Sequence, residues 1–499
     1  MKKILIGVFA ALVLAAWVVP AMAVDTTFYG TYRVRLFGTN NALDYSNDGA
    51  KTYTGVGSAT NVADGVTDNN SWTDQRFRLG VESKASDQLR GFVQLQMGGS
   101  GPNGSTVWGD GTSTGIVVRQ AYLSFNAGPV RIKAGRQIFG DNPDGGQAYR
   151  VSDDGIYYGL VDGGLVLIAQ IDAFVLATKA LDPVSLAFAY AKLDEDSYAG
   201  TPSQVTAASD EDSDVYAIQG VISPSDTLTA GAYFVYNRDR SSVSALTGLG
   251  TNTPWWLGAG VDTKFAMVNL KAHAVYKGGK WEKGCQPGSC GIAAGGAADD
   301  LKYSAYAIDA DVSMNLGAAK VGFAAGMGSG DDSTTDTKSK GFTGVAPSYG
   351  NQLGGRPAIF FDGGEVSNGG ARLNRTYANG ISTDGSSITN VTFIDLYASF
   401  KATDDLTLSG LVAKFWHTEK KVTTTTTNTN TWESALGTEL DLNAVYKLYP
   451  QLALVAQAAW FMPDEGIRTY KNTAGNNAIN SYATDDTVSE YFAKIQYDF

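Results

Sequence analysis

The chain has 499 residues, of which 43% are hydrophobic and 18% are charged, and its formal net charge of −12 disfavours a nucleic-acid partner. Its 59 glycines follow no triplet period and occur with 25 Tyr, 21 Phe and 9 Trp, which excludes a collagen-like or low-complexity chain. Beyond the first two dozen residues, no apolar run approaches the roughly 18 residues that a membrane-spanning helix needs. The remaining class is a large β protein.

The amino terminus has the features of a secretory signal at residues 1–23. Lys2 and Lys3 precede an apolar stretch, and Ala21-Met22-Ala23 provides a cleavage site of small residues. An uncleaved membrane anchor is the alternative, which the short apolar run disfavours. We therefore expect residues 24–499 to form one exported domain.

The rest of the chain repeats a pattern of two alternating runs joined by a short turn and followed by a long polar stretch. Phe77, Leu79 and Val81, for example, point to one face of a strand, and Arg76 and Arg78 to the other. Eighteen strands are predicted, with sixteen as the alternative because residues 138–176 are hard to divide and 154–160 could form a strand. The predicted strands are 26–38, 72–84, 88–98, 116–126, 129–138, 164–176, 181–195, 211–223, 226–238, 254–265, 268–279, 301–314, 319–328, 390–402, 404–418, 435–447, 451–462 and 487–499.

The connections between these strands alternate in length, which a soluble β-sandwich would not maintain. Short periplasmic turns and long external loops are typical of barrels in the bacterial outer membrane, where only a closed sheet satisfies every backbone polar group. We therefore predict an all-β, closed antiparallel transmembrane β-barrel in outer-membrane lipid and lipopolysaccharide. Its last strand, with Tyr491, Tyr497 and Phe499 on one face, would be the assembly strand for the barrel-assembly machinery. The long loops cover 39–71, 98–115, 138–163, 196–210, 239–253, 280–300, 329–389, 419–434 and 463–486.

The face of the strands away from lipid is basic in the first part of the chain. Barrels of 16–18 strands leave an aqueous channel, so these side chains would line a pore. Alternatively, each cation only solvates the lumen or pairs with a nearby carboxylate. Arg119 has the opposite parity and is left out, since it could lie at a strand top or a bulge. The predicted basic wall consists of Arg33, Arg35, Arg76, Arg78, Arg90, Arg131 and Lys133.

The third long loop is acidic and rich in glycine. Folded into the lumen, Asp141, Asp144, Asp153 and Asp154 would face the basic wall and form a narrow eyelet with a transverse field. The alternative is an exposed loop that binds divalent ions or lipopolysaccharide.

Two segments resemble the general porins of Gram-negative bacteria. Arg119-Gln120-Ala121-Tyr122-Leu123 and Ala134-Gly135-Arg136-Gln137 are similar to the strands ahead of the constriction loop in that family, and Phe28-Tyr29-Gly30 and Phe499 match its ends. The resemblance, closest to porins of deltaproteobacteria, implies a passive channel, a homotrimer, and a third loop that carries Asp141 and Asp144 into the pore. The chain departs from the family in its length and in the large loop at 329–389.

Few residues are available for other chemistry. Cys285 and Cys290 lie in one predicted external loop and suggest a local disulfide, with metal binding as the lesser alternative. His273 and His417 have no recognisable nucleophile or acid partner, so we expect no enzymatic activity, no cofactor and no metal. The leading hypothesis is a porin that passes ions and small hydrophilic solutes. The alternatives are a substrate-specific channel and a structural barrel that supports extracellular electron transfer.

Overall fold

The computed structural model describes the barrel strands and parts of the loops. Among these residues, no helix is long and apolar enough to cross a membrane. The described residues are 24–40, 70–97, 106–107, 115–139, 164–167, 169–194, 212–240, 251–282, 300–332, 337–345, 357–361, 388–420, 422–424, 429–471, 477–479 and 487–499.

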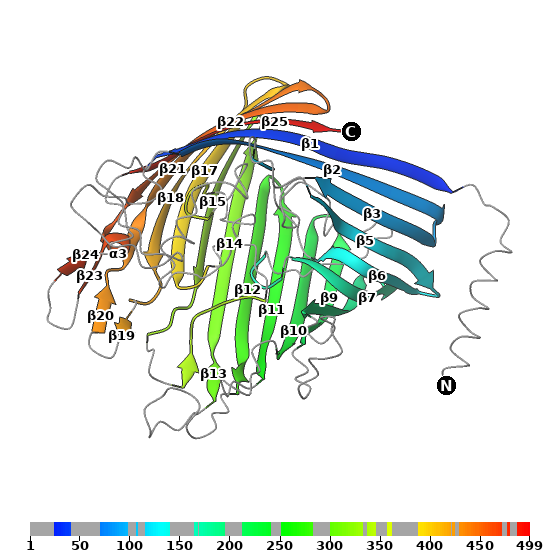
Figure 1. The fold of residues 1–499 in the computed structure, drawn as a ribbon, viewed down its shortest axis with the longest axis horizontal. Coiled ribbons are helices and arrows are strands. Elements are labelled where there is room, and N and C mark those ends of the chain that lie inside the picture. Colours follow the sequence, from blue (N-terminus) through cyan, green and yellow to red (C-terminus); the bar gives the residue numbers. More distant parts are fainter. Residues whose placement is uncertain are drawn as a thin grey trace.

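Eighteen long strands among the described residues form one closed ring, and each pairs antiparallel with its neighbours (Figure 1). The first and last strands, β1 and β25, pair from Thr31↔Asp498 to Asn40↔Ser489 and so close the barrel. The strands are β1 (Asp25–Asn40), β2 (Asn70–Ser86), β3 (Leu89–Met97), β5 (Ile116–Ala127), β6 (Val130–Phe139), β7 (Ala169–Leu181), β8 (Val184–Asp194), β9 (Ser213–Ser225), β10 (Leu228–Asp239), β11 (Asn252–Phe265), β12 (Val268–Trp281), β14 (Ala305–Leu316), β15 (Ala319–Gly328), β17 (Val391–Lys401), β18 (Leu406–His417), β21 (Ala435–Tyr449), β22 (Leu452–Pro463) and β25 (Val488–Asp498).

The predicted closed antiparallel barrel of eighteen strands is confirmed, and sixteen is excluded. Two of the largest differences are at the start of predicted strands. The strand predicted from residue 164 begins at Ala169, because Leu165, Val166 and Leu167 are buried inside the barrel. The strand predicted from residue 301 is divided into β13 (Leu301–Tyr303) and β14, because β13 also pairs in parallel with β16 (Lys338–Ser339).

The loops carry further short elements, where only polar connections are expected from the sequence. The strand β4 (Thr106–Val107) extends the main sheet beside β2, and the helix α3 (Glu465–Arg468) follows β22. A separate four-stranded sheet combines two of the long loops, with strands β19 (Val422–Thr424), β20 (Thr429–Trp432), β23 (Thr469–Lys471) and β24 (Asn477–Ile479).

The outer face of the ring is apolar. Leu123, Phe174, Leu257 and Leu396 are more than half exposed, while the residues adjacent to them in each strand point inward. Because successive side chains in a strand alternate between faces, this produces an apolar belt around the barrel. Such a belt fits a hydrocarbon environment and would be unstable in water.

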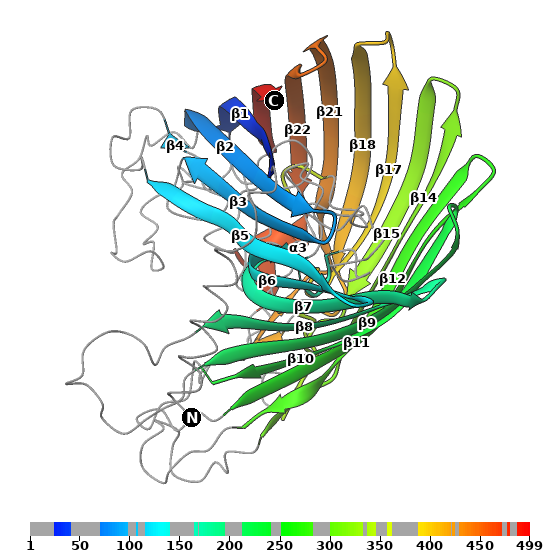
Figure 2. The ribbon, with the colours of Figure 1, turned by 90° about the vertical axis from the view of Figure 1, so that its right-hand side faces the viewer.

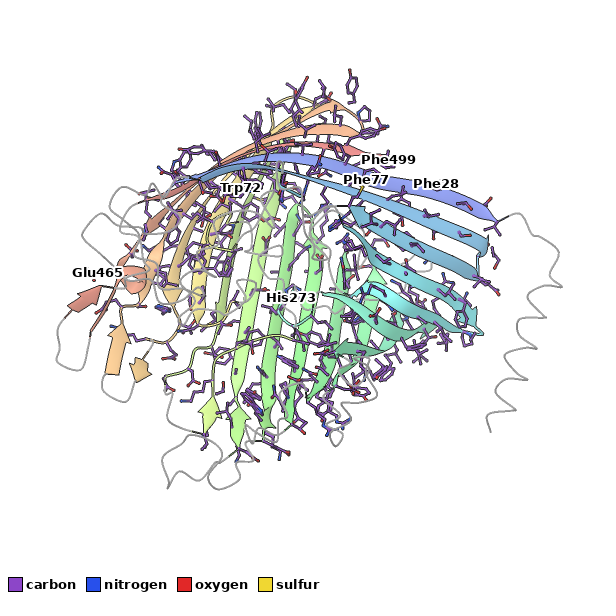
Figure 3. The ribbon with its side chains drawn as sticks, viewed as in Figure 1. Phe28, Trp72, Phe77, His273, Glu465 and Phe499 are labelled. Carbon is purple, nitrogen blue, oxygen red and sulfur yellow. The ribbon has the colours of Figure 1, made fainter. Side chains whose placement is uncertain are left out.

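The seam between β1 and β25 is sealed by Phe499. Its backbone N–H donates to the Gly30 oxygen at 3.0 Å, and the Gly30 N–H donates back to the Phe499 oxygen at 2.7 Å. The Phe499 ring stacks on Phe77 at a centroid distance of 6.0 Å, and Figure 3 shows the two rings together at this seam. A Cβ atom at position 30 would lie 2.2 Å from the Arg78 oxygen and 2.7 Å from the Phe499 ring. Glycine is therefore required here for close backbone approach.

Replacement of Gly30 by alanine is expected to weaken closure of the barrel. The added methyl group would force β1 away from both β2 and the end of β25. The measurement is the fraction of refolded protein that keeps the compact gel mobility of an unheated barrel in detergent, which should fall clearly. Gly38→Ala is the matched control on the same strand, because nothing lies within 4 Å of a Cβ at that position. Equal folded fractions for the two variants would contradict this account of the seam.

Candidate functional site

The seven predicted cations lie on the inward-facing side of neighbouring strands. Arg33 and Arg35 come from β1, Arg76 and Arg78 from β2, and the remaining three from β3 and β6. Arg33 is directly opposite Arg76 in the register of β1 and β2, so two guanidinium-bearing positions adjoin. The side chains share the face of buried residues such as Phe37, opposite the exposed apolar face that includes Leu36.

Local partners differ among these cations. Arg35 is fully buried and makes two parallel hydrogen bonds to the Asp74 carboxylate, at 2.9 and 2.6 Å. Arg90 lies 3.4 Å from Glu82. Arg78 donates to the Gln96 oxygen at 2.8 Å. The positive charge is thus compensated locally at Arg35 and Arg90, as the alternative interpretation of the sequence allowed.

Arg131 and Lys133 also contact neutral groups. Arg131 donates to the Asn126 oxygen at 2.9 Å, and the Lys133 ammonium lies 4.1 Å from the centroid of the Tyr122 ring. These contacts fix the direction of the two side chains.

A β-bulge adds an eighth cation to this face. The register of β3 and β5 moves from Gln94↔Gln120 to Leu95↔Val118, which leaves Arg119 as the extra residue. Its side chain is 3% exposed and donates to the Gln94 oxygen at 3.1 Å. The bulge turns Arg119 inward despite its outward parity, because an extra residue shifts the alternation by one.

An acidic wall lies on the other side of the ring. Sequence analysis missed it, although the signal was the same alternation, with Asp309 and Asp311 placed between Ile308, Ala310 and Val312. The strand β14 lies half-way round the ring of eighteen from β3. Figure 2 shows β2, β3 and β5 on one side and β17, β18 and β21 on the other. The buried carboxylates of β14, β17 and β21 are Asp309, Asp311, Asp395, Glu439 and Asp441, whereas Glu490 lies on β25 beside β1.

Two carboxylates of β14 have ordered partners. The Asp309 oxygen lies 2.8 Å from Nδ1 of His273, which is its direct partner across β12 and β14. The Tyr397 hydroxyl donates to Asp311 at 2.9 Å. Figure 3 shows His273 in the strand region of the barrel. These contacts hold the acidic groups at the inner surface.

Three loop segments fill part of the lumen. Residues 164–167 join residues 340–345 through a hydrogen bond from the Val345 N–H to the Val166 oxygen at 2.9 Å. Thr343 accepts from the Trp256 indole at 2.9 Å and from the Lys277 ammonium at 2.5 Å. The third segment, residues 357–361, packs against β17, β18, β21 and β22 and is almost fully buried. The large loop at 329–389 therefore contributes two inward segments.

Other predicted site residues can be placed as follows. Tyr491, Tyr497 and Phe499 are 50%, 46% and 41% exposed on the outer face. The acidic residues of the third loop and both cysteines lie outside the described residues, namely Asp141, Asp144, Asp153, Asp154, Cys285 and Cys290. Within the part of the chain that the structure describes, no three metal-ligating side chains gather.

No protein-family model matches the chain, and no curated protein has a detectably similar sequence. Several solved structures are similar. They include the outer membrane protein OpdK of Pseudomonas aeruginosa, with a TM-score of 0.48 at 10% identity, and a BenF-like porin from Pseudomonas fluorescens Pf-5, with 0.47 at 11%. OccAB2 of Acinetobacter baumannii has a TM-score of 0.46 at 13% identity. Each comparison covers 95% of this chain and 98% of the other. None of these supports the expected likeness to porins of deltaproteobacteria.

Loss of the Asp74 carboxylate is expected to destabilise the barrel. Asp74→Asn would leave the fully buried Arg35 guanidinium without its counter-ion, and breaking a buried ion pair costs on the order of 3 kcal/mol. The measurement is the urea dependence of unfolding from lipid vesicles. Asp404→Asn provides the control, because the Lys401–Asp404 pair at 2.9 Å is exposed in a turn and should contribute little. Equal stability of the two variants would show that the Arg35–Asp74 contact is energetically unimportant.

Proposed function

We propose that the chain forms a selective, water-filled channel for small hydrophilic solutes and ions across the bacterial outer membrane. The observation that carries this proposal is the segregation of charge on the inner face of a closed barrel. Basic residues gather on β1, β2, β3, β5 and β6, whereas carboxylates gather on β14, β17 and β21. Opposed walls of this kind produce a field across the pore that orients polar solutes and water.

The inward segments favour a selective channel over an open general pore. A ring of eighteen strands leaves a lumen too wide for the strand side chains to fill. Residues 340–345 and 357–361 are held in that space by specific hydrogen bonds and aromatic contacts. A narrower pore brings a solute closer to both charged walls, where its interactions are less screened by water. Passive diffusion through an unselective porin is the alternative.

The proposal includes the cellular context expected from the sequence. The chain would be exported through residues 1–23, and residues 24–499 would be inserted by the barrel-assembly machinery. The apolar outer belt fits contact with lipid and lipopolysaccharide. A homotrimer, an inward acidic third loop and the Cys285–Cys290 disulfide stay predictions.

The purified protein is expected to give discrete, ohmic conductance steps in planar bilayers. If the pore is selective, one class of solute should reduce the current in a dose-dependent way, while other solutes of equal size leave it unchanged. Uniform behaviour among solutes of one size would instead support the general porin. Absence of conductance from fully folded protein would refute the channel proposal.

The two walls should make opposite contributions to ion preference. Combined Arg76→Gln and Arg78→Gln substitutions are expected to shift the reversal potential in a salt gradient towards cation preference, because they remove positive charge from the pore wall. Asp309→Asn and Asp311→Asn should shift it towards anions. Arg136→Gln is the control, because Arg136 pairs with Asp172 at 2.9 Å on the outer face and is half exposed there. A reversal potential that does not respond to the wall substitutions would remove these residues from the conducting path.

A further inference from the structure

Residues 358–360 present three consecutive backbone N–H groups to two carboxylates of the barrel wall. The Ala358 N–H donates to Asp441 at 3.0 Å, and the Ile359 and Phe360 N–H groups donate to the two oxygens of Glu439 at 2.7 and 2.9 Å. Successive N–H groups that converge in a turn form a concave site for an anion. Here the acceptor groups are Glu439 and Asp441 of the barrel strand β21, and the N–H groups come from the large loop at 329–389.

The same turn inserts its aromatic side chains into the wall above β17, β18 and β22. The Phe360 ring stacks on Phe415 at 4.0 Å between centroids, with 17° between the ring planes. Phe361 meets Phe393 edge to face at 5.5 Å. All four rings are at most 1% exposed, so the contact excludes water. This patch supports the turn through dispersion and desolvation in addition to its hydrogen bonds.

Glu439 and Asp441 lie at positions i and i+2 of β21, face the same side, and are hydrogen-bonded to each other through their side chains. Glu439 is fully buried and Asp441 is 4% exposed, although each would be well hydrated in a water-filled lumen. Burial of charge is costly unless hydrogen bonds replace the lost water. The three N–H groups of the turn supply that replacement. The carboxylate pair of this wall is therefore placed to hold the turn.

We propose that Glu439 and Asp441 act as a clasp that holds residues 357–361 against the wall and thereby sets the width of the pore. This inference rests on the proposed channel function and assigns its positioning residues. The hydrogen bonds from the turn to these carboxyl oxygens each contribute roughly tenfold to the held arrangement. Neutralising the clasp therefore releases the turn without breaking the barrel, whose strands pair independently of this loop.

The combined Glu439→Gln and Asp441→Asn variant tests the clasp. Its amide groups lose acceptor capacity and present donors to the donors of the turn, so the single-channel conductance should rise about twofold or more and should fluctuate between levels. Asp172→Asn is the matched control, a carboxylate-to-amide change on the outer face with 57% side-chain exposure. Compact gel mobility of the unheated protein verifies that each barrel is closed. Phe360→Ala is a second variant that releases the turn while leaving the wall charges intact, and it should raise the conductance in the same direction.

Chemical accessibility gives a readout that is independent of conduction. Ala358→Cys, in a background with Cys285 and Cys290 changed to serine, introduces a thiol at a fully buried position of the turn. Its reaction with a small water-soluble maleimide should accelerate about tenfold or more when the clasp is neutralised. If conductance and reaction rate both equal those of the parent, the clasp is refuted while the channel stands. If the thiol is released but no protein conducts, the clasp is supported and the channel function is refuted.

Discussion

The pairing of β1 with β25 is the interaction on which the rest of the molecule depends. In hydrocarbon an unpaired backbone N–H or C=O has no water to bind, so an open sheet edge would be unstable. The pair joins chain segments that are almost the full length of the protein apart, and the mutual hydrogen bonds of Gly30 and Phe499 complete it. Once the ring is closed, each strand has one face towards lipid and one towards the lumen. Because side chains alternate between these faces, the position of a charged residue in its strand determines whether it faces lipid or the lumen.

The lumen combines two levels of electrostatic organisation. At short range, Arg35 and Asp74 neutralise each other within the basic wall, so the number of basic residues overstates the field that a solute would meet. At long range, β3 and β14 lie on opposite sides of the ring, and the carboxylates of β14 face the lumen. This separation of charge therefore follows from the order of strands. No pair of adjacent residues produces it.

The fold and the seven cations of the basic wall could be predicted because their determinants are local, whereas the bulge and the inward loop segments could not. Period-2 alternation and short turns specify each hairpin without reference to distant residues. Arg119 was omitted because parity fails at a bulge, and the bulge depends on the register of β3 against β5. The acidic wall was within reach of the same parity rule, since Asp309 and Asp311 alternate with apolar residues. Its position opposite the basic wall needed the full strand count.

The inward loop segments lay beyond sequence reasoning for a different physical reason. Ile359, Phe360 and Phe361 form an apolar group within a long loop, and such a group is stable only when a partner covers it. The partners are Phe393, Phe415 and the carboxylates of β21, which are distant in the chain and gather only after the barrel has closed. The strands thus determine the size of the ring and the sign of its walls. Residues 357–361 of the large loop in turn pack on those walls.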